Sequence, residues 1–407
     1  MEFVIYSLLI LAVSGALSMK NKYIGLAGAL IAALLTAVNN PLLLMILVIA
    51  IINLASLDLM KGFLRGVDYT LVGLIFVATV YAFYSQSLAF LLGMFVVASV
   101  PTYMMVMASD TGMRVEVGIK YMTFMVIATV LFLIGAVLMV HASATSSLAL
   151  YYIGFTMLIV GLAIEVGAGP FHEWVPDVFD TADPIPVSVI ASIAKFVPFV
   201  VAFKIVSSTH MGDEVITLIG SILAVVSMLV GNIGALTSQK PARILAYSTV
   251  ANMGYIIAAL IVAVKEEFIY LAFAGAMLQL LTNSLGKIGF FIGIKEKAMP
   301  TVETYVLALS FIGLPPLMGF WSKLYILSSL VYANFIWVAV LLVLNSAMSV
   351  PYYVRLMKTF EGTKGYRKVA AYLITLTAVL MLLTVVPPNW IIESSKLLMS
   401  YLAIGGV

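Results

Sequence analysis

Four ionisable residues lie within apolar stretches that are long enough to span a bilayer, namely Glu165, Lys195, Lys287 and Lys323. An ionisable side chain at the middle of a bilayer costs about 2.5–3.5 kcal/mol even on lenient insertion scales. Lys195 is near the centre of its stretch, so it must face protein or a water-filled cavity. Because burial makes the charged form costly, a lysine held there is suited to taking up and releasing a proton. A structural ion pair between helices is the alternative interpretation.

Two of these residues, Glu165 and Lys323, accompany segments in which glycine and proline interrupt a helix. The first segment is Gly167–Asp177 and the second is Gly313–Lys323. Proline removes a backbone donor, and in a membrane the freed backbone groups must be satisfied by protein or water, so such breaks line cavities. Breaks at corresponding positions of two halves are typical of inverted-repeat transporters. The prolines in these breaks are Pro170, Pro315 and Pro316.

Polar side chains recur on one face of a single predicted helix. Gln279, Asn283 and Lys287 fall at positions i, i+4 and i+8, which lie on the same side of an α-helix. Ser248 and Asn252 repeat this spacing on the preceding helix, where ordinary hydrogen bonds between helices are the simpler interpretation. For Lys287 the buried charge also fits a place in a proton path.

Three further residues are candidates for a supporting role, namely Glu116, His172 and Asp177. His172 lies in the first break, where it would relay protons or hold the break by a hydrogen bond. Asp177 belongs to an acidic segment, 173–183, that contains no basic residue. This segment predicts either a solvated loop or a place where protons and cations gather.

The composition places these residues in a membrane protein. Of 407 residues, 63% are hydrophobic and 10% are charged, whereas soluble domains average ~45–50% apolar and ~25% charged residues. These values exclude a soluble enzyme, a disordered chain and a nucleic-acid-binding protein, and they predict an all-α polytopic protein in the lipid bilayer. The absence of cysteine excludes disulfides, thiolate zinc sites and cysteine-held iron–sulfur clusters. No metal and no cofactor is expected, since only three scattered histidines occur: His141, His172 and His210.

Apolar runs between charged residues predict fourteen membrane helices. We divide them into an N-terminal group at 1–67, a first repeat at 68–206, a second repeat at 207–358, and a C-terminal helix and tail at 359–407. Each repeat would be an inverted unit of five helices that contains one broken helix, the seventh or the twelfth. The tail from Trp390 is a candidate for the membrane surface. The predicted helices are 3–19, 24–38, 41–57, 68–84, 88–108, 117–140, 147–167, 184–206, 214–236, 243–264, 267–294, 302–332, 335–357 and 367–386.

Basic residues are unevenly distributed among the loops between these helices. Loops that follow odd-numbered helices contain fifteen of the 21 basic residues, whereas those that follow even-numbered helices contain Lys204 and Lys265. The positive-inside rule then predicts that the odd-numbered loops face the cytoplasm and that both termini lie on the outer side of the cell membrane. The fifteen residues are Lys20, Lys22, Lys61, Arg65, Arg114, Lys120, Lys240, Arg243, Lys295, Lys297, Arg355, Lys358, Lys364, Arg367 and Lys368.

Four groups of residues form recognisable motifs between about residues 88 and 358. They are Glu116 with Lys120-Tyr121, Gly169–Val178 with Pro186-Val187-Ser188 and Lys195, Ile244–Thr249 with Gly254-Tyr255, and Gly313–Pro316 with Gly319-Phe320 and Lys323. Together they resemble the antiporter-like membrane subunits of respiratory complex I, and the quinone-proximal N-type subunit is the most similar. Related subunits occur in Mrp-type cation/proton antiporters and in membrane-bound hydrogenases. The predicted number of helices also fits this family.

The resemblance implies a chain of buried ionisable groups along the membrane midplane. The lysines of the family's eighth and twelfth helices correspond to Lys195 and Lys323, and its aspartate after the first break corresponds to Asp177. Two positions depart from the family. Its glutamate on the fifth helix falls near Met94, which cannot ionise, and its lysine on the seventh helix falls on Glu165. This exchange would either let Glu165 pair directly with Lys195 or leave the first half-channel altered or inactive.

The sequence therefore predicts a proton-translocating membrane subunit of a complex I-like oxidoreductase that uses NADH or another donor. Protons would pass along Glu165, Lys195, Lys287 and Lys323, while redox chemistry takes place in partner subunits and no catalytic redox site lies in this chain. Lys287 stands where N-type subunits usually have a small residue and the related L-type subunits have a lysine. The expected partners are antiporter-like sister subunits and the quinone-site module.

Three other functions remain open at this stage. The chain would serve as a subunit of a Mrp-type sodium/proton antiporter or of a membrane-bound hydrogenase. It would otherwise be a non-conducting structural subunit of the same complex, which Met94 favours. An unrelated secondary transporter for a solute is the third alternative, although the sequence contains no recognisable substrate site.

Overall fold

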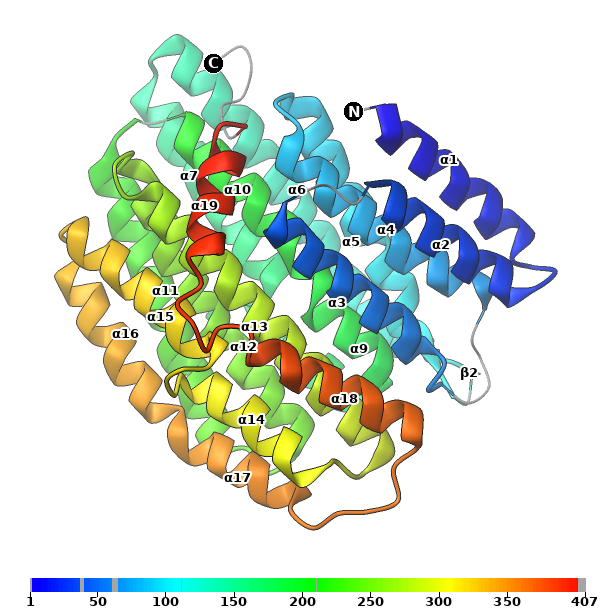
Figure 1. Cartoon of the computed structure of the whole chain (residues 1–407). Helices are drawn as coiled ribbons and strands as arrows, with labels where there is room; N and C mark the ends of the chain where they lie inside the picture. The colour runs from blue at the N-terminus through cyan, green and yellow to red at the C-terminus, as the bar shows by residue number, and fades with distance from the viewer. Residues whose placement is uncertain (1, 37–39, 61–64, 111, 210, 402–407) are drawn as a thin grey trace.

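A computed structural model describes residues 2–36, 40–60, 65–110, 112–209 and 211–401, and most of these residues are helical (Figure 1). Lys61, His210, the expected helix end at 38 and the predicted tail beyond 401 lie outside them. Within the described residues, nine helical segments are long and apolar enough to cross a membrane. The prediction of a helical, multi-pass membrane protein is therefore confirmed.

The helices follow one another with short connections. From the N-terminus they are α1 (Glu2–Leu17), α2 (Lys22–Thr36), α3 (Pro41–Leu57), α4 (Gly66–Tyr84), α5 (Leu88–Met107), α6 (Val115–Thr145), α7 (Leu148–Val166), α8 (Trp174–Thr181), α9 (Pro184–Ala191), η1 (Ile193–Lys195) and α10 (Phe196–Ser208). They continue with α11 (Asp213–Thr237), α12 (Pro241–Leu260), η2 (Ile261–Val264), α13 (Ile269–Glu296), α14 (Thr301–Ile312), α15 (Met318–Tyr332), α16 (Ile336–Met348), α17 (Val350–Phe360), α18 (Lys368–Met381) and α19 (Asn389–Met399).

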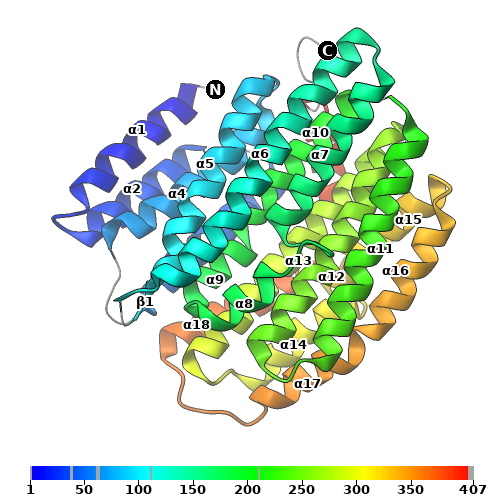
Figure 2. The ribbon, with the colours of Figure 1, turned by 180° about the vertical axis from the view of Figure 1, so that it is seen from behind.

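A small antiparallel hairpin joins α5 to α6, where the sequence predicted only a loop. Its strands are β1 (Ala108–Ser109) and β2 (Gly112–Met113), and Ala108 is paired with Met113. The hairpin lies at the end of the bundle opposite to the start of α1 and the end of α19 (Figure 1). From behind, α8 and α9 lie at the same end as β1 (Figure 2).

The centre of the bundle is formed by α12, α13 and the segment from α9 to α10, whose side chains are almost all buried. The outer helices instead expose large apolar side chains, such as Ile127 and Val130 on α6 and Val340 on α16. A helix that is apolar on every side is stable only in a protein core or in lipid. The outer helices therefore form the lipid-facing or partner-facing belt, and the ionisable residues of interest lie inside it.

Two helices that the sequence predicted as continuous are divided. The predicted helix 184–206 consists of α9, η1 and α10, and the predicted helix 335–357 consists of α16 and α17. Pro198 lies in the first turn of α10 and Pro351 in the first turn of α17. A proline ring clashes with the carbonyl four residues earlier, so each helix is interrupted just before its proline.

The C-terminal tail, which the sequence suggested for the membrane surface, forms helix α19 within its described part. Its helix α19 packs against α3 and α13, and Ile391 and Leu398 on this helix are buried. One side of α19 therefore belongs to the protein core, and its place at the membrane surface stays a prediction.

Candidate functional site

The first break begins where α7 ends at Gly167, which has a left-handed conformation (φ 74°). The last carbonyl groups of a helix have no donor within the helix. At this end, the carbonyl oxygens of Glu165 and Val166 accept hydrogen bonds from the ammonium of Lys195 at 3.2 and 3.1 Å. The Trp174 indole donates to another carbonyl of this turn at 2.9 Å, and the Lys195 Nζ lies 5.0 Å from the centroid of the Trp174 ring.

The second break repeats this arrangement. Helix α14 ends at Gly313, which also has a left-handed conformation (φ 91°). The ammonium of Lys323 donates to the carbonyl oxygens of Phe311 and Ile312 at 2.9 and 2.8 Å, and to the Ser346 hydroxyl at 2.9 Å. Each break therefore has one buried lysine on the last carbonyl oxygens of the interrupted helix.

The two lysines reach equivalent places from different elements. Lys195 ends η1, which follows α8 and α9 after the first break, whereas Lys323 lies in α15, directly after the second break. Because the C-terminal end of a helix carries the negative end of its macrodipole, a cation is stabilised at both places. The fold thus provides each ammonium with acceptors and a favourable field without a carboxylate partner.

The Glu165 side chain is buried next to this first lysine. The Ser99 hydroxyl on α5 donates to its Oε1, and its Oε2 has no hydrogen-bond partner among the described residues. The ammonium of Lys195 contacts the backbone carbonyl of Glu165 rather than the carboxylate. The direct pairing of the Glu165 carboxylate with the Lys195 ammonium was one of the two alternatives that this exchange left open, and no hydrogen bond joins the two groups in this structure. Met94 lies in the core on the same helix as Ser99 and supplies no ionisable group.

Lys287 is fully buried in α13, as its place within an apolar stretch predicted. Its ammonium donates to the Leu245 carbonyl oxygen at 2.5 Å and to the Ser248 hydroxyl. It also lies 5.3 Å from the centroid of the Phe311 ring. Lys287 therefore joins α12 to α13, and through Phe311 it approaches the end of α14.

A series of hydrogen bonds connects the surroundings of the two breaks. The Ser322 hydroxyl donates to Gln279 Oε1 at 2.5 Å, and Gln279 Nε2 donates to Asn252 Oδ1 at 2.8 Å. Asn252 Nδ2 donates to Asn283 Oδ1 at 3.5 Å, and Asn283 Nδ2 donates to the Ala191 carbonyl oxygen at 3.0 Å. Ser322 precedes Lys323, and Ala191 ends α9 shortly before Lys195, so this polar series runs between the two lysines.

The sequence-based assignment of Lys204 to an outer loop is wrong. This residue is fully buried in α10, and its ammonium donates to the carbonyl oxygens of Phe83, Ser85 and Tyr401 at 2.8, 2.7 and 2.9 Å. The signal in the sequence was the apolar run on both sides of it, with Phe203 before and Ile205 after. Lys204 joins the end of α4 to the segment that follows α19.

The three supporting candidates lie outside this buried series. Glu116 is exposed in the first turn of α6. The His172 ring lies 3.1 Å from the Pro170 carbonyl oxygen, through Nδ1, which is the local hydrogen bond that one interpretation predicted. Asp177 lies at the surface and forms ion pairs with Lys120 and, at 3.7 Å, with Arg243.

Basic residues from other parts of the chain surround the acidic segment 173–183. Asp180 pairs with Lys240 at 2.8 Å, and Asp183 pairs with Lys295 at 2.5 Å. The segment is thus neither a plain solvated loop nor an uncompensated negative patch. Among the described residues, no three His, Asp or Glu side chains gather in a way that would hold a metal ion.

Comparison with known proteins places this arrangement in a family. Residues 85–349 match the protein family described as NADH:quinone oxidoreductase/Mrp antiporter, TM. The chain belongs to this family. One curated relative, NADH-quinone oxidoreductase subunit N of Bdellovibrio bacteriovorus, is 27% identical over 327 residues, which cover 71% of this chain and 67% of that protein. Across the first three curated relatives, the matched part spans 57–76% of their length.

Two solved structures have the same fold over almost the whole chain. A chain of the Mrp complex from Dietzia sp. has a TM-score of 0.80 at 17% identity, with 98% of this chain and 96% of that chain covered. A chain of respiratory complex I from Thermus thermophilus has a TM-score of 0.76 at 24% identity, with 95% and 98% covered. Both similar chains are subunits of complexes with several proteins.

Proposed function

We propose that this chain is a proton-translocating membrane subunit of a complex I-like oxidoreductase that uses NADH or another electron donor. The observation that carries the proposal is the hydrogen-bonded polar series between Lys195 and Lys323, each of which is held at the end of an interrupted helix. The relatives named NADH-quinone oxidoreductase subunit N support the same function.

In this function, the charge changes one residue after another along the buried chain of Glu165, Lys195, Lys287 and Lys323. A protonated ammonium has three N–H donors and the neutral amine has two. Loss of the proton therefore leaves one of the three acceptors of Lys323 without a donor, and at both helix ends it replaces charge-assisted hydrogen bonds with weaker neutral ones. This loss loosens the break and favours the entry of water. The buried Oε2 of Glu165, which has no partner among the described residues, is available to take up a proton beside Lys195.

We further propose that the chain crosses the membrane fourteen times. In this topology α7 with α8, α9 with α10, α14 with α15, α16 with α17 and α18 with α19 each form one pass. The first inverted repeat would occupy 68–206 and the second 207–358, with 1–67 before them and 359–407 after them. The matching lysine-capped breaks of α7 and α14 support this division. The excess of basic residues in alternate loops supports outer termini in the cell membrane.

The partners we propose are antiporter-like sister subunits and the module that binds quinone. This follows from the chemistry of the chain, because the described residues contain no cluster for a redox metal and the sequence contains no cysteine. Electron transfer and its donor and acceptor would therefore belong to other subunits, and this chain would contribute the proton path alone.

The test is Lys195→Ala in the assembled complex, reconstituted into vesicles. We expect the number of protons moved per electron to fall, since the first break loses its ionisable group, while electron transfer remains measurable. An unchanged number of protons moved per electron would contradict the proposal. Lys240→Ala is the control, because it too replaces a lysine with alanine. Lys240 lies at the surface, where it is ion-paired to Asp180.

A second candidate is a subunit of a Mrp-type antiporter, which the fold shared with the Mrp chain favours. Sodium-dependent proton exchange in vesicles without any electron donor would support this candidate over the first. A silent structural subunit is the third possibility, because Met94 replaces an ionisable residue of the family. In that case Lys195→Ala would change neither pumping nor exchange.

A further inference from the structure

Helix α3 lies outside residues 85–349, which match the family, and it packs against α9 and η1 (Figure 1). Its sequence, PLLLMILVIAIINLASL, is apolar except for Asn53 and Ser56. Asn53 is fully buried, and a buried amide is costly unless it forms hydrogen bonds. The partners of the Asn53 side chain therefore show through which contact α3 reaches the rest of the protein.

Asn53 reaches the residue at which the predicted helix 184–206 is interrupted. Its Nδ2 donates to Ser192 Oγ at 3.0 Å and to the Ile49 carbonyl oxygen of its own helix at 3.0 Å. The Ser192 hydroxyl has acceptors at Asn53 Oδ1, 3.4 Å away, and at the Val189 carbonyl oxygen, 3.3 Å away. The amide and the hydroxyl thus face each other through both polar atoms of the Asn53 side chain.

Ser192 links this contact to Lys195. The backbone of Ser192 is not helical (φ −115°, ψ −100°), and it lies between the end of α9 and η1. Its carbonyl oxygen accepts a hydrogen bond from the Lys195 N–H at 3.1 Å, which closes the turn of η1. The preceding carbonyl oxygen, of Ala191, accepts from Asn283 Nδ2 at 3.0 Å. The interruption is therefore held by one asparagine of α3 and one of α13.

The place of the Lys195 ammonium depends on this turn. Its Nζ lies 3.2 and 3.1 Å from the carbonyl oxygens of Glu165 and Val166, at the upper end of the usual range for an N–H···O hydrogen bond. Because a much longer contact is no longer a hydrogen bond, a small rotation of η1 would separate the ammonium from the end of α7. Whatever fixes Ser192 therefore also fixes this ammonium.

We propose that Asn53 is a positioning residue for proton transfer. It holds Ser192, and through the turn of η1 it keeps the Lys195 ammonium at the end of α7. This inference rests on the proposed function of Lys195. It gives α3 a role in the proton path without any ionisable group, whereas an ordinary structural bond between helices would leave pumping unchanged.

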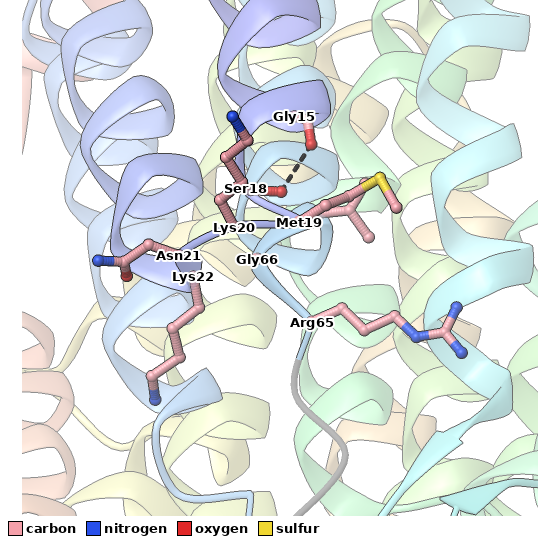
Figure 3. Close-up of a pocket in the computed structure, with 9 residues that line it drawn as sticks. Gly15, Ser18, Met19, Lys20, Asn21, Lys22, Arg65 and Gly66 are labelled. Carbon is pink, nitrogen blue, oxygen red and sulfur yellow. Dashed lines mark hydrogen bonds between the residues drawn. The ribbon is translucent and has the colours of Figure 1, made fainter.

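The other helices of the N-terminal group have a separate feature. A cavity of about 570 Å³ opens between the turn that joins α1 to α2 and the start of α4 (Figure 3). Neither Asn53 nor Ser192 is among the residues that line it. Substitutions at these two positions therefore test their mutual contact and leave the lining of this cavity unchanged.

The test compares Asn53→Leu, Ser192→Ala and the double variant in the assembled complex, reconstituted into vesicles. The part of proton pumping that is lost in Lys195→Ala measures the contribution of this site. We expect each single variant to reduce this contribution roughly threefold, which corresponds to one hydrogen bond of about 0.6 kcal/mol between membrane helices. The double variant should reduce it no further, because both substitutions remove the same contact.

Asn40→Ala is the matched control, because it changes another asparagine of the same helix. Asn40 Oδ1 accepts from the Leu42 N–H at 2.9 Å and so caps the start of α3. Loss of this cap loosens α3 but retains the contact between Asn53 and Ser192, so pumping should be unchanged. Ser192→Thr keeps the hydroxyl and should pump like the wild-type chain, in contrast to Ser192→Ala.

The outcomes separate this inference from the proposed function. Full pumping in Asn53→Leu, while Lys195→Ala still lowers pumping, would overturn the positioning role alone. Equal losses in Asn40→Ala and Asn53→Leu would also overturn it, because they would assign Asn53 to the stability of α3. No effect of Lys195→Ala would instead overturn the proposed function.

Discussion

At the scale of single residues, the buried cations of this chain are stabilised by backbone oxygen atoms rather than by carboxylates. Lys195, Lys287 and Lys323 each donate to at least one carbonyl oxygen, and their ammonium groups form no ion pair within the described residues. Charge in the apolar interior is costly unless it has such partners. For Lys195 and Lys323 the acceptors come from the ends of interrupted helices, so the breaks are what permit these two lysines to be retained. Lys287 instead donates to Leu245 and Ser248 within α12.

The residue-scale prediction concerns Glu165, whose carboxylate accepts from Ser99. Glu165→Gln keeps an acceptor for that hydroxyl but cannot exchange a proton. We expect proton translocation to slow by about tenfold or more, in line with the loss of a proton-transfer group. Dye-quenching measurements of pumping in reconstituted vesicles would check this.

The control for Glu165 is Asp213→Asn, which removes a surface carboxylate paired with Lys265 at 3.5 Å. Pumping should be unchanged in this variant. If the two substitutions slow pumping equally, the special role of Glu165 is refuted and the effect is one of general charge loss.

At the scale of elements, the second break depends on the close approach of α15 to the end of α14. A Cβ atom at Gly319 would lie 1.7 Å from the Ser310 carbonyl oxygen. We expect Gly319→Ala to destabilise the protein by about 1–3 kcal/mol, because the two elements must separate. Thermal unfolding of the purified protein would measure this, and pumping should fall with it because Lys323 lies one turn further on α15.

Gly93 offers the matched control for this substitution. It lies within α5, and a Cβ atom there would meet nothing within 4 Å. Gly93→Ala should leave stability unchanged or raise it by up to about 1 kcal/mol. Equal destabilisation by both substitutions would contradict the role assigned to Gly319.

A second element-scale prediction concerns Lys204 and the C-terminal helix. Lys204→Met would remove the donor for three carbonyl oxygens, including that of Tyr401. Because buried acceptors without partners are costly, we expect α19 to detach from the bundle more often. Hydrogen exchange of the backbone amides of α19 should then accelerate by roughly tenfold or more.

Lys265→Met is the control for Lys204→Met. The sequence assigned both lysines to loops that follow even-numbered predicted helices, but Lys265 is exposed. Exchange in α19 should keep its original rate in this variant. Unchanged protection of α19 in Lys204→Met would mean that packing against α3 and α13 alone holds the helix.

At the scale of the whole molecule, charges that are far apart in the sequence become neighbours at one end of the bundle. Lys120 from α6, Arg243 from α12 and Lys295 from α13 pair with acids of the segment 173–183. The first break is therefore bordered by compensated charge at the surface and by Lys195 in the interior. This arrangement separates the ion-paired surface from the proposed proton path.

The prediction at this scale tests the proposed orientation. The chain contains no cysteine, so a single introduced cysteine reports its own position without background. Lys364→Cys places a thiol in the exposed loop between α17 and α18, and Glu267→Cys places one in the exposed turn before α13. The proposed topology puts these two positions on opposite sides of the membrane. A membrane-impermeant maleimide added to intact cells should label the thiol at 267 and leave the one at 364 unlabelled. The reverse pattern would invert the proposed topology.

The sequence by itself determined that this is a helical membrane protein, that Glu165, Lys195, Lys287 and Lys323 are buried, and where two helices break, although it missed the buried Lys204. These features follow from local composition, because transfer into lipid and proline geometry depend on neighbouring residues alone. The helix-face pattern also placed Gln279, Asn283 and Lys287 together, since helical spacing is a local property.

Only the tertiary structure decided what each charge contacts. It put Lys195 on the carbonyl oxygen of Glu165 rather than its carboxylate, and it brought Lys204 to the carbonyl oxygen of Tyr401, 197 positions away in the chain. Neighbours at such separations depend on how whole helices pack, and no local pattern in the sequence specifies this. The same reason explains why the acidic segment 173–183 is compensated by lysines and arginines of other helices.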